Sequence, residues 1–196
     1  MYSQAIFPDR YRACGVRLRP LTLGHALLLD RLGNPFGSHR LLDPDSPKPT
    51  FADLLLAAFV VSRPWRTAEW QVDSAWVRWW VAIKYVTRKW TVERDADGIL
   101  AWYRAMWACP RMQVIRDDDS QTPERGAELL NVLSLFACRH LNCTPYTALD
   151  LRIAQLQHDF ACHAEESGAV QIVEAQEDLL IELAKRDAAE SEATHG

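Results

Sequence analysis

The residue types best suited to chemistry gather in the C-terminal half of the chain. Six of them form two groups in the sequence: Cys138, His140 and Cys143, then His158, Cys162 and His163. Thiolate and imidazole are ligands that zinc prefers, and one ligand from the second group would complete a tetrahedral site. The spacing matches no standard zinc module, and a free Cys packs as a small apolar residue. Packing is therefore the favoured interpretation, and no metal or cofactor is expected.

Local signatures of catalysis are not found in the sequence. Nucleophilic catalysis needs a nucleophile, a base and an orienting group, but the chain has no G-x-S-x-G elbow and no glycine-rich phosphate loop. Three consecutive carboxylates at residues 117–119 lie in a polar stretch and are most simply solvated. We expect a protein that is not an enzyme.

A segment rich in Trp and basic residues is the most unusual feature of the chain. Six of the eight Trp lie between Trp65 and Trp90, and Trp76, Trp79 and Trp80 recur at helical spacing. The basic residues of the segment are Arg63, Arg66, Arg78, Lys84, Arg88 and Lys89. Helical spacing favours burial in the core, with the long basic side chains packed over the edges. A protein-binding surface and a stacking platform for single-stranded nucleic acid remain open alternatives.

Two helix starts carry clear capping signals. Thr22 precedes an apolar run over residues 23–32, and Gly33 followed by Asn and Pro ends it. Thr50 with Asp53 three residues later resembles a capping box for a second helix over residues 51–61. That helix is apolar on nearly all sides, so we expect it at the centre of the core.

Further helices are predicted by apolar periodicity along the rest of the chain. Their expected ranges are residues 67–90, 95–107, 124–141, 144–167 and 170–185. No run of alternating apolar and polar residues indicates a strand. The predicted fold is all-α, an irregular bundle of about seven to eight helices.

The composition of the sequence indicates how the chain divides into parts and in which compartment we expect the protein. Residues 1–115 form the Trp-rich part, residues 116–124 a polar linker or loop, residues 125–190 a three-helix part, and residues 191–196 a disordered tail. The net charge of −4 argues against a general nucleic-acid or membrane binder. Five irregularly spaced Cys, no secretory signal and no apolar run near the roughly 20 residues of a membrane span favour a cytoplasmic protein.

The predicted C-terminal helices have apolar stripes and acidic outer faces. In the last of them Leu179, Leu180 and Leu183 point inward, while Glu174, Glu177, Asp178 and Glu182 lie outside. Ordinary packing is the simpler explanation, but such helices also close grooves over a partner helix. If the chain binds a protein partner, we expect the contacts at these three Leu and at Trp76, Trp79 and Trp80.

Three segments resemble a known class of proteins. Residues 18–36 (LRPLTLGHALLLDRLGNPF) resemble the opening of small helical proteins encoded among the structural genes of tailed bacteriophages and prophages. Residues 53–65 (DLLLAAFVVSRPW) are similar to their second helix, and residues 144–151 (TPYTALDL) to a late helix of tail-assembly chaperone-like proteins.

The resemblance implies a protein that binds and does not catalyse. Tail-assembly chaperones hold the long helical tape-measure protein in solution until the tube protein polymerises around it. The implied partner is therefore a tape-measure or other tail protein in the cytoplasm of a bacterial host, and a homo-oligomer is also possible. A minor structural or connector protein of the particle, or a nucleic-acid-binding accessory protein, is the alternative.

Overall fold

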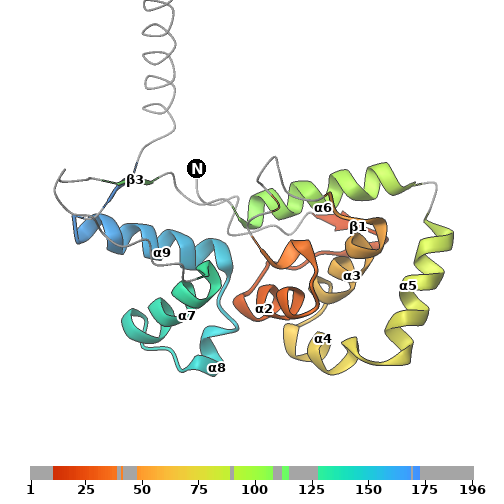
Figure 1. The fold of residues 1–196 in the computed structure, drawn as a ribbon, viewed down its shortest axis with the longest axis horizontal. Coiled ribbons are helices and arrows are strands. Elements are labelled where there is room, and N and C mark those ends of the chain that lie inside the picture. The colour runs from red at the N-terminus through yellow and green to blue at the C-terminus, as the bar shows by residue number, and fades with distance from the viewer. Residues whose placement is uncertain are drawn as a thin grey trace, which may run out of the picture. The chain divides into compact units, whose positions relative to one another are not determined.

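The computed structural model describes residues 11–38, 41, 48–88, 91–107, 112–114, 128–168 and 170–172. Within these ranges the fold is all-α, as the sequence predicts (Figure 1). The helices are α2 (Leu23–Arg31), α3 (Phe51–Val61), α4 (Trp65–Val72), α5 (Ala75–Thr87), α6 (Val92–Met106), α7 (Leu129–His140), α8 (Pro145–Ala148) and α9 (Ile153–Glu166). A 3-10 turn, η1, spans Pro35–Gly37. The predicted linker at residues 116–124 and the tail at residues 191–196 lie outside the described residues.

The two capping signals are confirmed. The hydroxyl of Thr22 accepts from the backbone N–H of His25, whose ring completes the capping box of α2. In α3, the hydroxyl of Thr50 accepts from the backbone N–H of Asp53, and the carboxylate of Asp53 accepts from the backbone N–H of Thr50. Gly33 adopts a left-handed φ of 65° directly after α2, which explains why the helix ends there.

Helix α3 lies at the centre of the N-terminal helices, as its sequence predicts. It packs against α2, α4, α5 and α6, and seven of its eleven residues are buried. The aromatic side chains Phe36, Phe59, Trp102 and Tyr103 complete this core. The indole N–H of Trp102 donates to the carbonyl of Arg19 at 2.8 Å, so that the core also fixes the segment before α2.

The helix predicted over residues 67–90 is wrong, because the chain forms two helices there. Helix α4 begins two residues earlier, at Trp65, and ends at Val72, and α5 begins at Ala75. Asp73 and Ser74 form the break, since such short polar side chains compete for backbone groups and favour turns over helix interiors. The break redirects α5 along the outer side of α3.

The single helix predicted over residues 144–167 is also wrong. Thr144 and Pro145 start a helix as expected, but α8 ends at Ala148 and α9 begins at Ile153. The carbonyls of Leu149 and Leu151 accept from the first two amides of α2, each at 2.9 Å, and the amide of Ile153 returns a bond to Leu21. These tertiary hydrogen bonds hold the turn outside helical geometry.

Four short strands were not predicted. Strands β1 (Arg12–Ala13) and β2 (Val16–Arg17) form an antiparallel hairpin. Strand β3 (Met112–Val114) pairs antiparallel with β4 (Val170–Ile172), which contradicts the start of the helix predicted over residues 170–185. The rest of that predicted helix lies outside the described residues. Strands of two or three residues are too short to show an alternating pattern.

The chain forms two compact units. Unit 1 comprises residues 1–108 and 125–157, and unit 2 comprises residues 109–124 and 158–196. Unit 1 holds the helices from α2 to α8, and unit 2 holds the β3–β4 pair. This grouping places α7 and α8 with the Trp-rich helices, whereas the sequence-based division, which kept residues 125–190 together, stays a prediction.

Replacing Gly37 with Ala is expected to destabilise unit 1 by about 1–3 kcal/mol, because a side chain there overpacks the contact between η1 and α2. A Cβ at this position would lie 2.4 Å from the amide nitrogen of Asp30 and 2.8 Å from the carbonyl oxygen of Ala26. The matched control is Gly33→Asn, because Asn tolerates a left-handed φ and the space around Gly33 is open. Urea unfolding followed by Trp emission compares the two, and equal stabilities would contradict the packing argument.

Candidate interaction surface

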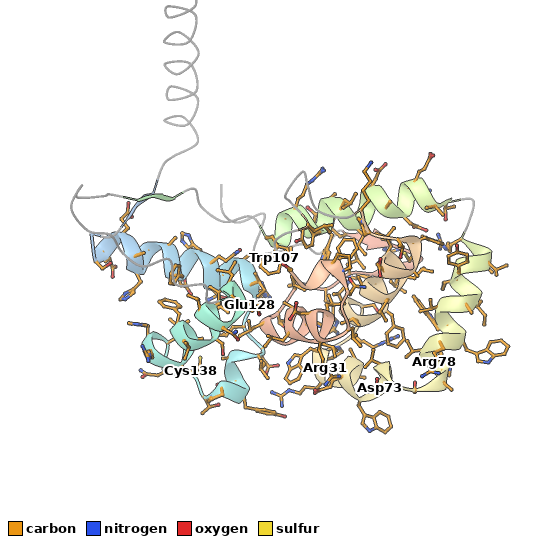
Figure 2. All side chains as sticks on the ribbon, in the orientation of Figure 1. Arg31, Asp73, Arg78, Trp107, Glu128 and Cys138 are labelled. Atoms are coloured by element: carbon orange, nitrogen blue, oxygen red, sulfur yellow. The ribbon has the colours of Figure 1, made fainter. Side chains whose placement is uncertain are left out.

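Helix α5 exposes a stripe of large apolar side chains along one edge of unit 1. Trp79 is 70% exposed and Trp76 61%, and Ile83, Tyr85 and Val86 are also exposed. Trp76, Trp79, Ile83 and Val86 share one side of the helix, and we call these four residues the α5 surface; Tyr85 lies on the other side. In Figure 1 the helix runs along the right-hand side of unit 1, and Figure 2 marks its position by Arg78 and the preceding turn by Asp73. Contiguous apolar surface of this kind marks interaction sites in soluble proteins.

The opposite side of α5 fixes the helix to the core. Val77 is the one buried residue of α5, and the Trp80 ring packs edge-on against Phe59 with 5.3 Å between centroids. Tyr85 contacts Phe51 of α3 at 5.4 Å. The two hydrophobic neighbours Trp79 and Trp80 therefore have different roles: Trp80 anchors the helix, and Trp79 faces outward.

Two apolar hollows accompany the α5 surface. One has a volume of about 550 Å³ and is lined by Arg78, Trp79, Ala82, Ile83, Val86 and Thr87. The other, of about 630 Å³, lies between α3, α4 and α5, where Leu56, Val72 and Val81 form part of its wall. Stripes and hollows of this size suit the side chains of an amphipathic helix laid along α5.

The charges on α5 are all positive. Residues 75–88 contain Arg78, Lys84 and Arg88 and no acidic residue. Arg88 lies 3.7 Å from the carboxylate of Asp95, which also accepts from the amide of Cys14 at 2.9 Å. Arg88 thus fixes the end of α5. Nζ of Lys84 lies 5.7 Å from the ring centroid of the anchoring Trp80, whereas Arg78 lines both apolar hollows. An occupant that carries carboxylates beside its apolar stripe would be electrostatically complementary.

The structure separates the Trp residues into two sets. Trp65, Trp102 and Trp107 are buried, and Trp65 agrees with the interpretation that the Trp residues of the segment from Trp65 to Trp90 are core. That interpretation is wrong for Trp76 and Trp79, and also for Trp70, which is 84% exposed on α4. Trp80 is half-buried. The sequence carried a signal of this exposure. Helix α5 has apolar residues on every side, and packing against α3 on one side cannot bury all of them.

The other predicted contacts, Leu179, Leu180 and Leu183, lie outside the described residues. Sequence reasoning missed Tyr85 as a surface residue and did not single out Trp70. Neither position follows from spacing alone, since exposure depends on the break at Asp73 that turns α5 along α3.

The Cys and His residues do not form a cluster in the part of the chain that the structure describes. No group of three or more His, Cys, Asp or Glu side chains there could hold a metal ion. The ring of His140 stacks on Phe136 with 5.2 Å between centroids. The sulfur of Cys162 lies 3.8 Å from Nε2 of His158, four residues earlier on α9.

A third, polar hollow of about 580 Å³ lies within unit 1. Arg17, Arg19 and Arg152 line it, together with Asp150 and His25. Asp150 accepts from the Trp65 indole at 2.6 Å and from Arg66 at 2.7 Å, and these two hydrogen bonds lower the pKa of its carboxyl. Nε2 of His25 lies 2.8 Å from the carbonyl of Arg63. Asp150 and His25 are the two side chains of this hollow that have acid–base chemistry. Their hydrogen bonds hold α2, α4 and the end of α8 together.

Comparisons with protein-family models, with curated proteins and with solved structures give no significant match. Among the described helices, none has the length and apolarity that crossing a bilayer requires. The α5 surface is therefore the feature of the described residues that bears most directly on function.

Proposed function

We propose that the chain is a tail-assembly chaperone of a tailed bacteriophage or prophage, which binds a helical segment of the tape-measure protein without covalent chemistry in the cytoplasm of the bacterial host. The observation that carries the proposal is the exposed apolar stripe of α5, with Trp79 at 70% exposure. A free protein gains stability when such a stripe is covered, so a partner helix with its own apolar stripe is the natural occupant.

The phage assignment comes from the resemblance of residues 18–36, 53–65 and 144–151 to proteins of phage structural gene clusters. The all-α fold and the capped α2 are compatible with it. A minor structural or connector protein would use the same surface but stay in the particle, so the two functions differ in the fate of the chain rather than in the interface.

Replacing Trp79 with Asp is expected to abolish partner recovery and to leave the fold intact. The side chain is largely exposed, so its loss costs little stability, whereas a central Trp of an interface contributes about 2 kcal/mol or more, roughly a 30-fold change in affinity. The measurement is an affinity pull-down of tagged protein from cells that express the surrounding gene cluster, with mass spectrometry of the retained proteins.

Trp70→Asp is the matched control, since Trp70 is also exposed but lies on α4. Recovery of one very long helical protein by the unmodified chain and by the control, with the bait missing from finished particles, supports the chaperone. A bait found within particles supports the structural alternative. Equal recovery by all three chains would exclude the α5 surface as the interface.

Binding of single-stranded nucleic acid is a second candidate, favoured by one observation. The exposed Trp76 and Trp79 share α5 with Arg78 and Lys84, and the helix has no acidic residue, as a stacking platform requires. Affinity for an oligonucleotide would then fall about sevenfold between 50 and 200 mM salt, as about two phosphate contacts predict. A fluorescence anisotropy titration with a labelled 20-mer tests it, and absence of binding at low salt would exclude it.

A further inference from the structure

The polar hollow of unit 1 gathers guanidinium groups that the proposed function does not use. Arg17, at the end of β2, and Arg19 are exposed and line the hollow, while Leu18 between them is buried in the core. Arg152 reaches the same hollow from the turn between α8 and α9. Two segments that lie far apart in the sequence therefore bring positive charge to one cavity.

Backbone hydrogen bonds hold the residues that carry these groups. The amide of Arg19 donates to the carbonyl of Val61 at 3.0 Å, and the carbonyl of Arg19 accepts from the indole of Trp102 at 2.8 Å. Thr22 and Arg152 pair in an antiparallel bridge. The walls of the hollow are thus fixed by the fold of unit 1, and binding sites for small molecules are usually preformed in this way.

The side chains that line the hollow carry a net positive charge. Among the described residues that line it, three Arg contribute +3 and Asp150 contributes −1, which leaves +2. His25 adds nothing at neutral pH, because burial lowers the pKa of its ring to about 4. The carboxylate of Asp150 already accepts from Trp65 at 2.6 Å and from Arg66 at 2.7 Å. The hollow therefore favours an anion, and in particular a dianion.

The start of α4 adds positive potential at the same place. Pro64 and Trp65 line the hollow, and α4 begins at Trp65 without a side-chain cap. The first amides of a helix carry a partial positive charge that attracts anions. Pro20, Pro64 and Trp65 also supply an apolar wall beside the guanidinium groups. The hollow thus combines an anion-binding side with an apolar side.

We propose that this hollow binds a small phosphate monoester, whose phosphate contacts Arg17, Arg19 and Arg152 and whose organic group lies against Pro20 and Pro64. A phosphate monoester carries a charge of about −1.5 to −2 near neutral pH, close to the opposite of the charge of the lining. The planar guanidinium group offers paired N–H donors that match phosphate oxygens. The volume of about 580 Å³ is that of an ordinary small-molecule site. None of the residues of the α5 surface lines this hollow, so the site is independent of the proposed function.

Isothermal titration calorimetry of the full chain with phenyl phosphate tests the site. We expect a Kd of about 1 mM or tighter, a modest affinity for a ligand of this size. Arg19→Gln should weaken binding about tenfold or more, because a charge-assisted hydrogen bond to the phosphate is lost. The side chain of Arg19 is exposed and its printed bonds are made by the backbone, so the variant should fold. Arg17→Gln, also exposed, makes the same test from β2.

Arg104→Gln is the matched control, because it removes the same charge from an exposed position on α6 that does not line the hollow. It should change the Kd for phenyl phosphate less than about twofold. Equal weakening by Arg104→Gln and Arg19→Gln would overturn the proposal, since the attraction would then come from the charge of the whole chain. Absence of binding at about 10 mM phenyl phosphate would also overturn it.

Three further probes identify the chemistry of the ligand. Methyl phenyl phosphate, a diester with a single negative charge, should bind about fivefold or more weakly than phenyl phosphate, and equal affinity would contradict the preference for a dianion. Inorganic phosphate should also bind more weakly, because it has no organic group for the apolar wall. Equal binding of inorganic phosphate would exclude the ester. Displacement of phenyl phosphate by a single-stranded 20-mer would assign the hollow to a nucleic-acid backbone and overturn the proposal.

Discussion

Replacing Trp102 with Ala is expected to destabilise unit 1 by about 3–5 kcal/mol, the cost of removing a large buried aromatic side chain. Trp102 is fully buried, and its indole N–H donates to the carbonyl of Arg19 at 2.8 Å. The substitution leaves a cavity in the core and removes the indole donor to the part-buried carbonyl of Arg19. A loss of this size is a large part of the stability of an ordinary domain.

Trp79→Ala is the matched control for Trp102→Ala. It deletes the same side chain from an exposed position, and we expect a loss below about 1 kcal/mol. All eight Trp lie within residues 65–107, so Trp emission during urea unfolding reports on unit 1. Similar losses for the two variants would mean that α5 is buried against something in the free protein.

Trp102→Phe separates the two components of the loss. It retains most of the apolar area but removes the N–H donor, so its stability should fall between those of the unmodified chain and Trp102→Ala. A variant as unstable as Trp102→Ala would show that the hydrogen bond to Arg19 outweighs the packing.

The parts of the fold that the sequence predicts are those fixed by local chemistry. The caps at Thr22 and Thr50 depend on a hydroxyl and on a partner three residues later, and the end of α2 depends on the left-handed Gly33. The central position of α3 follows from a helix that has no polar side to expose. Each of these features is complete within a few residues of sequence.

The parts that sequence reasoning missed depend on distant residues. The turn between α8 and α9 exists because the carbonyls of Leu149 and Leu151 bond to amides of α2, more than a hundred residues away. The orientation of α5 depends on the turn at Asp73, on the burial of Val77 and on the packing of Trp80 against Phe59 of α3. Periodicity cannot distinguish Trp79 from Trp80, because both lie on an apolar helix and only the packing shows which one faces out.

His25 should make unit 1 less stable as the pH falls below neutral. Burial lowers the pKa of its ring from 6.5 to about 4, and Arg19 adds to this, while the carbonyl of Arg63 and Asp150 oppose it. Nε2–H donates to the Arg63 carbonyl, and Nδ1, 2.9 Å from the Thr22 hydroxyl, also faces the Thr22 amide at 3.3 Å. A proton on Nδ1 would face that N–H, so the folded state keeps the ring neutral.

The unfolded state takes up a proton near pH 6.5, and the folded state does so only near pH 4. Between these values the unfolded chain binds more protons, so the free energy of unfolding falls as the pH falls. The loss should be about 2 kcal/mol between pH 7.5 and pH 5, and about 3 kcal/mol once the pH is below 4. The pKa of Asp150 is lowered from its ordinary value of 3.8, so its titration changes the free energy of unfolding only at a pH well below 5.

His25→Gln is expected to remove most of this pH dependence and to retain the helix start. Gln is a usual residue at this position of a capping box and can bond to the amide of Thr22 without titrating. Urea unfolding of both chains at pH 7.5, 6 and 5, followed by Trp emission, measures the slope. The variant should be less stable than the unmodified chain at pH 7.5, where the hydrogen bond to Arg63 is lost, and should change little on acidification. An equal slope in the two chains would show that another group titrates, and that the His25 ring is protonated in the fold or exposed to water.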